Sequence, residues 1–548
     1  MNIKCQKLRV LLSALIVCLA AAGVISIGTA AADPVVVTEN GPLKGITTAT
    51  THEYLGIPYA VPPIGTLRWT PPQPSGRWHG VLDATKFGNF CTQPNGTGGT
   101  FGSEDCLSLN VYTPRQKKNH EHDGPWQEHH RRPLPVMVWI HGGSLVSGGG
   151  GFYDPTRIVE QGDVIVVTIN YRLGLLGFFA HPAIDAEGHR NGNYGTMDQQ
   201  LALKWVKSNI AAFGGDSDRV TIFGESAGAQ SVYVNLTSPT AAGLFERAIA
   251  ESGAYVQFQD YFDSIVPLAQ GETAGSAYVL SGIDQATAMG CTSQTAQCLR
   301  ALPASTVILQ DPSVTYPFVD GTILTTTPTA AFASGAFNRV PVITGGNHDE
   351  YRLFVADAYD ALGHPLASTD YTNATLKLFG NSLGRAVLLL YPLTNYPNPG
   401  EALGASGTDA IFACPERNSV RSLSQYVRTY AYEFNDENAY LVFNQFPSPP
   451  YPAISFPLGA PHFSEVPYLF DVFSTTSVFT PDQKDLSEAM ISYWTRFAAK
   501  GNPNSPDRPH WTPYNSATDI FHSLVPPTPT DESTFDTDHL CSAFWNTF

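Results

Sequence analysis

The sequence predicts an α/β fold in which a central, mostly parallel β-sheet is covered by helices on both faces. Two observations predict it. Residues 136–140, 164–169 and 220–223 are apolar runs, a pattern typical of strands that are buried on both faces. Between the second and third runs, apolar residues recur at roughly helical spacing over residues 195–213. Buried strands that alternate with helices indicate a parallel sheet.

The elements around this core have recognisable ends. Residues 35–37 and 43–46 flank Asn40-Gly41, a pattern that predicts a small hairpin with a tight turn. The expected long helix stops at Phe213-Gly214-Gly215, where two glycines interrupt the helical spacing. The strand at residues 220–223 follows directly and is itself followed by a second helical pattern.

Length and composition are compatible with one large domain. The chain has 548 residues, of which 43% are hydrophobic, enough to bury a large core. From about residue 260 to 450 the pattern is irregular, with expected helices and proline-rich loops. No clear linker interrupts the chain, so we expect residues 33–548 to form a single domain with excursions from one core.

The N-terminus has the pattern of an export signal. Lys4, Lys7 and Arg9 precede a short apolar stretch over residues 11–22, and Ala30-Ala31-Ala32 offers a cleavage site before Asp33. We expect residues 1–32 to be removed and the protein to be secreted, either extracellular or periplasmic. A retained anchor is the alternative, which the shortness of the stretch disfavours. Because no later segment looks long and apolar enough, no stable membrane insertion is expected.

The charge balance excludes some classes of partner. The formal net charge of the chain is −17. Without the three basic residues of the export signal, 28 basic and 48 acidic residues remain, a net charge of −20. Such a balance argues against nucleic acid and against anionic membrane surfaces as partners. It indicates neither a substrate nor an oligomeric state.

Six cysteines remain after removal of the signal, and an even number in an exported protein predicts disulfides. Six cysteines allow 15 pairings, and the sequence alone does not choose among them. Local spacing suggests Cys91–Cys106 and Cys291–Cys298, which leaves Cys414–Cys541 to tie the C-terminal end to the body. No CxxC pair is present, so no metal site is expected.

The run Gly224-Glu225-Ser226-Ala227-Gly228 is the strongest functional signal. It lies between a predicted strand and a predicted helix, which is the context of a nucleophile elbow. Such a turn exposes the serine oxygen and directs the next amide, that of Ala227, toward a developing oxyanion. The run Gly380-Asn381-Ser382-Leu383-Gly384 fits the same pattern, so the flanking sequence must separate the two.

The flanks resemble one family. Phe213-Gly214-Gly215 together with residues 220–228 resembles the active-site signature of type-B carboxylesterases, the family that includes cholinesterases and some fungal lipases. Residues 104–112 resemble the second signature of that family, with Ser108 as a minor departure. The resemblance covers essentially the whole mature chain. It implies an α/β-hydrolase fold with helical excursions around an active-site gorge, and a carboxylic ester hydrolase that needs no cofactor.

The resemblance also implies the partners of Ser226. The acid of the family lies in a Gly-x-x-x-Asp-Glu stretch, which makes Glu350 the expected acid and Asp349 the alternative. The next residue is usually small, but here it is Tyr351, which could alter the packing behind the site. The histidine of the family ends a Gly-x-x-His stretch, which makes His462 the expected general base. The order serine, acid, histidine fits the fold.

Further site residues are implied in the same way. Gly142-Gly143-Ser144 matches the glycine-rich oxyanion loop, so the amides of Gly143, Ser144 and Ala227 are expected to hold the oxyanion. Ser144 replaces a frequent glycine, a change that could narrow the acyl side without removing a backbone donor. Ser252 matches a serine that hydrogen-bonds the acid in relatives. An ordinary turn residue is an equally good interpretation of Ser252 from the sequence.

Other prominent residues have structural interpretations. Arg68 with Glu104, and Arg172 with Asp198, match buried ion pairs of the family. Ser382 lies after Glu350 and lacks the family flanks, so we interpret residues 380–384 as the entry to a helix. Asn95, Asn235 and Asn373 begin glycosylation sequons, which matter only in a eukaryotic host.

The predicted function is therefore that of a secreted serine carboxylesterase acting on a small-molecule ester through Ser226, Glu350 and His462. The segment between Cys91 and Cys106 has Phe101 as its only aromatic residue and lacks the tryptophan with which cholinesterases bind choline, so choline esters are not expected. Its shortness favours small soluble esters. A lipase for longer acyl chains is the alternative, and a non-catalytic adhesion module of the same fold is a third possibility.

Overall fold

The computed structural model describes residues 33–115, 132–255, 265–275, 280–310, 315–441 and 454–547. The predicted export signal, residues 1–32, lies outside the described residues and stays a prediction. Within the described ranges, no helix combines the length and the apolar character needed to cross a membrane.

Eleven strands of the described residues form one mixed sheet, in the order β18-β17-β15-β14-β13-β12-β9-β11-β8-β4-β3. Their bounds are β3 (Ile46–Thr47), β4 (Thr51–Pro58), β8 (Ser108–Pro114), β9 (Leu134–Ile140), β11 (Ile165–Ile169), β12 (Gly215–Glu225), β13 (Arg247–Glu251), β14 (Val342–Asn347), β15 (Thr429–Phe434), β17 (Phe521–Leu524) and β18 (Thr530–Glu532). The pairings from β11 to β17 are parallel. Antiparallel strands complete both edges. The predicted α/β fold with a mostly parallel sheet is confirmed.

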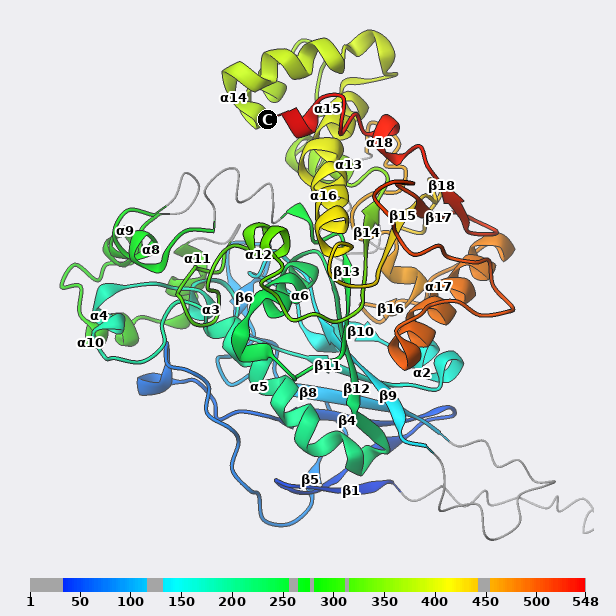
Figure 1. The fold of residues 1–548 in the computed structure, drawn as a ribbon. Helices are drawn as coiled ribbons and strands as arrows, with labels where there is room; N and C mark the ends of the chain where they lie inside the picture. Colours follow the sequence, from blue (N-terminus) through cyan, green and yellow to red (C-terminus); the bar gives the residue numbers. More distant parts are fainter. Residues whose placement is uncertain are drawn as a thin grey trace, which may run out of the picture.

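Helices cover both faces of this sheet (Figure 1). Helices α5 (Tyr194–Asn209), α6 (Ala227–Thr237), α12 (Pro328–Ser334) and α16 (Cys414–Leu423) lie on one face, and α2 (Thr156–Gly162) and α17 (Pro481–Lys500) lie on the other. Alternating side chains of β9 divide the core accordingly. Val136, Val138 and Ile140 pack with α5 and α6, whereas Met137 and Trp139 pack with α2 and α17.

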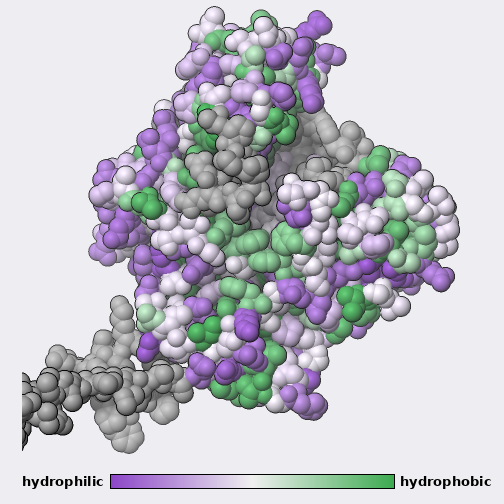
Figure 2. Space-filling view, turned by 180° about the vertical axis from the view of Figure 1, so that it is seen from behind, coloured by the Kyte–Doolittle hydropathy of each residue, from purple (hydrophilic) through white to green (hydrophobic). Residues whose placement is uncertain are grey.

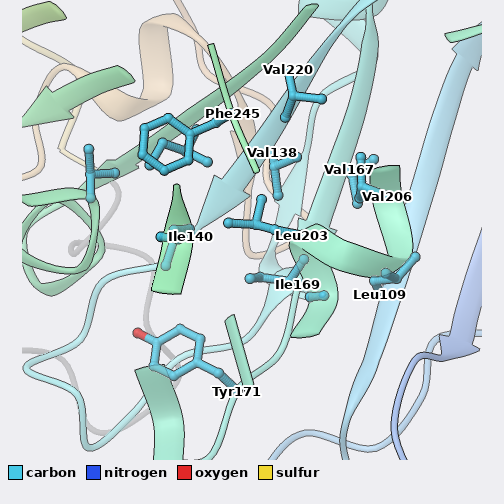
Figure 3. Close-up of a cluster of buried hydrophobic side chains, with 14 of the residues drawn as sticks. Leu109, Val138, Ile140, Val167, Ile169, Tyr171, Leu203, Val206, Val220 and Phe245 are labelled. Carbon is cyan, nitrogen blue, oxygen red and sulfur yellow. The ribbon is translucent and has the colours of Figure 1, made fainter. Parts of the chain in front are cut away.

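The first of these two core layers is shown in Figure 3. Apolar side chains from three neighbouring strands and from α5 are buried against one another there: Leu109, Val138, Ile140, Val167, Ile169, Leu203 and Val206. Burial of each such side chain contributes about 1.5–3 kcal/mol. The core therefore holds the carboxyl ends of β9, β11 and β12 in fixed positions.

The elements at the start of the chain follow the sequence closely. Strands β1 (Val35–Thr38) and β2 (Gly41–Lys44) pair antiparallel, with Thr38 opposite Gly41, so the predicted hairpin is confirmed. They form a small separate sheet with β5 (Leu82–Asp83). The predicted long helix is α-helical only to Asn209. A 3₁₀ turn continues it to Phe213, and Gly214, with φ 86°, then ends it.

The irregular region forms two helical excursions (Figure 1). One contains α8 (Leu268–Thr273), α9 (Gly282–Ala288), α10 (Ala296–Ala301) and α11 (Ala304–Gln310), and the other contains α13 (Tyr351–Val355), α14 (Tyr371–Leu390) and α15 (Pro399–Gly407). Gly380, with φ 74° and ψ 170°, interrupts α14, and the exposed Ser382 follows it in the resumed helix. The interpretation of residues 380–384 as a helix entry is confirmed.

The remaining elements are short: β6 (Gln93–Pro94), β7 (Thr100–Phe101), β10 (Tyr153–Asp154), β16 (Asp471–Val472), α3 (Gly174–Gly177), α4 (Pro182–Asp185) and α18 (Phe535–Asp538). On the face seen in Figure 2, hydrophilic and hydrophobic residues are interspersed, and a paler to green area lies near the middle, beside residues drawn in grey.

Covalent and ionic links join the layers. Disulfides connect Cys91 with Cys106 and Cys291 with Cys298, the two pairings that local spacing suggested, and Cys414 with Cys541, the pair that remained. The ion pairs Arg68–Glu104 at 2.6 Å and Arg172–Asp198 at 2.8 Å are also present. Of the three sequons, that of Asn235 is buried and hydrogen-bonded within the core, so its side chain is inaccessible in the folded chain.

Candidate active site

Ser226 occupies a sharp turn between β12 and α6. Its backbone has φ 55° and ψ −124°, a conformation that L-residues rarely adopt. The turn can form only because the residues two positions before and two positions after Ser226 are glycines. A Cβ atom would lie 2.4 Å from the carbonyl oxygen of Ile140 at Gly224, and 1.9 Å from it at Gly228. The end of β9 therefore packs directly against the turn, and the serine stands at the carboxyl edge of the sheet.

Two further residues complete a hydrogen-bonded series. His462 Nε2 lies 2.8 Å from Ser226 Oγ, and His462 Nδ1 lies 2.5 Å from Glu350 Oε2. The other oxygen of Glu350 accepts a hydrogen bond of 2.8 Å from the Asn347 N–H at the end of β14. Both Glu350 and His462 are buried, so the series is shielded from water except at the serine. This arrangement can transfer a proton from the serine hydroxyl to the imidazole.

Asp349, the alternative acid, points elsewhere. One of its oxygens accepts a 3.0 Å hydrogen bond from the Ala460 N–H, and the other lies 2.8 Å from an Arg352 nitrogen. The carboxylate of Asp349 therefore fixes the segment before His462 without contacting the imidazole. The structure brings Ser226, His462 and Glu350 together and leaves Asp349 and Ser382 out.

Glu225 is a site residue that the sequence did not single out. Its Oε1 atom lies 3.2 Å from His462 Nε2, on the side of the imidazole that faces the serine. Burial raises the pKa of Glu225 well above its usual value. Burial lowers the pKa of His462, but the carboxylates of Glu225 and Glu350 outweigh this effect and raise it to about 9. The position directly before the nucleophile was the only sequence signal for this carboxylate.

Ser252 differs from the expectation. Its hydroxyl donates to Glu465 Oε1 at 3.5 Å, whereas the two oxygens of Glu350 are in contact with the Asn347 N–H and with His462 Nδ1. Glu465 is itself held by the Asn347 side chain at 2.6 Å. Burial, aided by the charge of Glu350, raises the pKa of Glu465 to about 7. Ser252 therefore touches the acid only indirectly, through this second carboxyl group and Asn347.

The glycine-rich loop after β9 lies against the nucleophile. A Cβ atom at Gly142 would be 3.1 Å from Ser226 Cβ, so the loop passes directly beside the serine. Gly143 has φ 102° and Ser144 has φ 55°. Among the described residues, no acceptor takes a hydrogen bond from the N–H groups of Gly143, Ser144 or Ala227. These donors are free to bind an oxyanion, and Ala227 adds the positive end of the α6 dipole.

Gln93, which the sequence did not indicate either, ties this loop to the Cys91–Cys106 segment. The side-chain amide donates to the carbonyl oxygen of Gly148 at 2.8 Å, and its oxygen accepts from the Gly148 N–H at 2.9 Å. Gly148 in turn packs on His141, whose Nδ1 is 2.8 Å from the Gly142 carbonyl oxygen. Burial lowers the pKa of His141 to about 4, so its imidazole is neutral and donates this bond.

Aromatic side chains enclose the imidazole. Phe354 and Phe412 lie with their ring centroids 5.1 and 5.2 Å from that of His462. Tyr351, the unusual residue after the acid, packs on Gly407 of α15, where a Cβ atom would come within 2.2 Å of the tyrosine ring. The bulky side chain is thus accommodated by a glycine on a neighbouring helix. Its effect on the acyl pocket stays a prediction.

A tyrosine side chain also contacts the nucleophile. Tyr255 hydrogen-bonds with Ser226 and donates to Gln230 at 3.3 Å. A small, mostly apolar cavity is lined by Leu175, Phe178, Val266, Tyr316 and Phe318, and neither Ser226 nor His462 lines it. Among the described residues, the one group of side chains spaced to hold a metal ion contains neither Ser226, His462 nor Glu350.

Comparisons with known proteins relate the chain to known esterases. The profile of the carboxylesterase family matches residues 32–539. The human cocaine esterase is 34% identical over 531 residues, which cover 88% of this chain and 86% of that protein. The para-nitrobenzyl esterase of Bacillus subtilis is 34% identical over 503 residues, covering 88% of this chain and 93% of the relative. A solved structure of a PNB esterase is similar with a TM-score of 0.73 and 31% identity, covering 93% of this chain and all of that one.

Proposed function

The chain belongs to the carboxylesterase family and is a carboxylic ester hydrolase, and on this premise we propose that it cleaves esters through Ser226, His462 and Glu350. The observation that carries the proposal is the unbroken series of hydrogen bonds from Ser226 Oγ through His462 to Glu350, at 2.8 and 2.5 Å. The strained backbone of Ser226 supports it, because such strain is kept where a function requires it.

The proposed reaction has two halves. Ser226 Oγ attacks the ester carbonyl carbon while its proton passes to His462 Nε2, and Glu350 stabilises the imidazolium that forms. The amides of Gly143, Ser144 and Ala227 hold the negative oxygen of the tetrahedral intermediate. His462 then protonates the leaving alcohol, which leaves an acyl-enzyme.

Water completes the cycle by the reverse use of the same groups. His462 takes a proton from water as the water attacks the acyl carbon, and the second tetrahedral intermediate returns to the same three amides. Its collapse returns the proton to Ser226 Oγ and releases the carboxylic acid.

Hydrolysis of a p-nitrophenyl ester series from acetate to palmitate tests this proposal with Ser226→Ala. We expect turnover to fall by about 10⁴-fold or more, since the nucleophile is lost while the amides and the binding site remain. Ser382→Ala is the matched control, because Ser382 occupies the second G-x-S-x-G pattern on an exposed helix. It should hydrolyse at the wild-type rate. Wild-type turnover in a folded Ser226→Ala sample would refute the assignment.

The same series tests the substrate class. We propose small and medium-sized soluble esters, because the Cys91–Cys106 segment folds back on itself as the two-residue strands β6 and β7 and is fixed by Gln93. Activity that peaks at the palmitate end would instead favour the lipase alternative.

We also propose that the protein is secreted. The three disulfides support an oxidising compartment, and the pattern of residues 1–32 supports export. N-terminal sequencing of protein recovered outside the cytoplasm should begin at Asp33. A chain that starts at Met1 in that fraction would contradict removal of the signal.

A further inference from the structure

Three side chains that are far apart in the sequence converge behind the site. His348 follows β14, Glu433 lies in β15 and His539 follows α18. His539 Nε2 is 2.6 Å and His348 Nδ1 is 3.1 Å from the same atom, Glu433 Oε1. One ligand-type atom from each of the three residues lies within 4.8 Å of the others. None of the steps proposed above uses these residues.

The three atoms form a ligand set of a known kind. Two imidazole nitrogens and one carboxylate oxygen suit zinc and related divalent cations, which bind such atoms at about 2.0–2.2 Å. Ligand atoms around a tetrahedral ion of that size stand roughly 3.3 Å apart. The two short separations at Glu433 would therefore have to open by less than about 1 Å, within the reach of side-chain rotation.

The groups behind the ligands already fix their orientation. Asp409 Oδ1 accepts a hydrogen bond of 2.6 Å from His539 Nδ1, which leaves Nε2 as the atom that faces Glu433. Tyr391 donates to the second oxygen of Asp409 at 2.6 Å. Asn435 donates to Glu433 Oε2 at 3.1 Å, which leaves Oε1 as the atom that faces the two histidines. Supporting carboxylates of this kind fix the tautomer and the ring orientation of metal-binding histidines.

The charge of the cluster favours a cation. Asp409 and Glu433 are buried carboxylates that flank the two imidazoles. Together they bring negative charge into a part of the molecule that is shielded from water. Either two protons on the histidines or one divalent cation between them would offset it.

Access from solvent is present on one side only. The side chain of His348 is 36% exposed, whereas those of His539 and Glu433 are 3% and 4% exposed. An ion could enter past His348, and water could supply the fourth ligand from the same side. Because two of the ligands are buried and one is accessible, an ion could enter the site, and a bound ion would exchange only slowly with solvent.

We propose that His348, Glu433 and His539 bind one divalent transition-metal cation, for which zinc is the best chemical fit. The ion would join the C-terminal segment to the carboxyl ends of β14 and β15. The role is structural, because the ligands do not touch Ser226 or His462. No sequence motif indicates the site, because Glu433 lies 85 residues after His348 and 106 residues before His539.

The test uses the untagged full-length protein, stripped with a chelator, dialysed and titrated with Zn²⁺ and separately with Co²⁺. We expect one ion per chain to survive gel filtration, a visible absorption typical of four-coordinate Co²⁺, and a higher midpoint of thermal unfolding with Zn²⁺. His364→Ala is the matched control, since it removes an exposed histidine elsewhere and should leave binding unchanged.

His348→Lys separates a metal site from a simple ion-pair network. A lysine keeps a positive charge beside Glu433 but cannot act as a ligand while protonated. We expect this variant to fold and to lose metal affinity by about 100-fold or more, because one of three protein ligands is gone. Equal metal binding by His348→Lys and wild type would place the ion elsewhere and overturn the proposal. Absence of bound metal in the wild type would also overturn it and would identify the cluster as an ion-pair network.

Discussion

Two serines of the candidate site share an unfavourable backbone conformation for different reasons. Ser226 and Ser144 both have φ 55°, and Leu145 follows at φ 60°. Each such residue costs about 1 kcal/mol or more relative to ordinary backbone. At Ser226 the cost places the hydroxyl at the edge of the sheet. At Ser144, which is exposed, the same cost leaves the N–H of the residue available to a ligand. The N–H groups of Val146 and Ser147 donate to the Gly143 carbonyl oxygen and hold this turn in place.

The proton affinity of His462 leads to a prediction about pH. An imidazole must be neutral to accept the serine proton, and the pKa of His462 is raised to about 9 because Glu225 and Glu350 outweigh the lowering effect of burial. Activity should therefore rise with pH through a value above the ordinary histidine value of about 6.5. Burial raises the pKa of Glu225 too, so this effect on His462 requires Glu225 in its ionised form.

Removal of one charge tests that cause. In Glu225→Gln the ascending limb of kcat/KM against pH should move to lower pH by about one unit or more, since an uncharged amide no longer stabilises the imidazolium. The measurement is the rate of hydrolysis of a stable alkyl ester at pH values between 6 and 10, monitored by titrating the acid that is released. Glu160→Gln, which changes an exposed carboxylate, is the control. An identical limb in Glu225→Gln and wild type would contradict the electrostatic explanation.

At the scale of elements, the position of the oxyanion loop depends on a neighbour from another part of the chain. The loop itself contains residues with left-handed backbone and few internal hydrogen bonds. Gln93 of β6 supplies two hydrogen bonds to Gly148, and Asn170 Oδ1 accepts from the Gly150 N–H at 2.8 Å. The disulfide Cys91–Cys106 fixes the segment from which Gln93 extends. The amide donors are thus placed by contacts outside the loop.

We therefore expect Gln93→Ala to lower kcat by about 10- to 100-fold with little change in KM. The loop would lose its two hydrogen bonds, and a shift of roughly 1 Å in the oxyanion donors weakens binding of the transition state more than that of the substrate. Steady-state kinetics on one soluble ester provide the two constants. Gln73→Ala, an exposed glutamine on a neighbouring loop, should leave both unchanged. A rise in KM with normal kcat would assign Gln93 to substrate binding instead.

Periodicity and turn chemistry were enough to predict three neighbouring strands of the central sheet, at residues 136–140, 164–169 and 220–223, and the hairpin of the small separate sheet. The strands around residues 136–140 and 164–169, the β1–β2 hairpin and the helix end near Gly214 all follow from local pattern. The helical excursions could not be predicted in the same way, because their contacts are long-range. Tyr351 fits only because Gly407, 56 positions later, leaves space for its ring. No local pattern around Tyr351 indicates that space.

The candidate site shows the same division. Ser226 followed from its local context, whereas Glu350 and His462 were expected from the family resemblance, and the structure brings all three together. Gln93 and Glu225 carry no distinctive pattern of their own and were missed. Ser252 was expected to hydrogen-bond the acid by resemblance, but its hydroxyl donates to Glu465.

At the scale of the whole molecule, the last residues of the chain are bound into the second helical excursion. Cys414 and Cys541 lie in one apolar cluster with Phe379, Val387, Tyr391 and Trp545. The indole nitrogen of Trp545 donates to the hydroxyl of Tyr391 at 2.8 Å, and Tyr391 also holds Asp409. The C-terminal segment therefore connects the sheet, the excursion and the cluster of His348, Glu433 and His539.

The C-terminal disulfide should consequently be the most stabilising of the three. It closes a loop of 127 residues, against 15 for Cys91–Cys106 and 7 for Cys291–Cys298. In the loop-entropy treatment these separations correspond to about 5, about 3 and about 2 kcal/mol of unfolding free energy. The double variant Cys414→Ala/Cys541→Ala should therefore unfold at clearly lower urea concentration than Cys291→Ala/Cys298→Ala, the matched control, with both measured at neutral pH by fluorescence. Equal or smaller destabilisation by the C-terminal pair would mean that the packing around Trp545, and not the covalent link, holds the end of the chain in place.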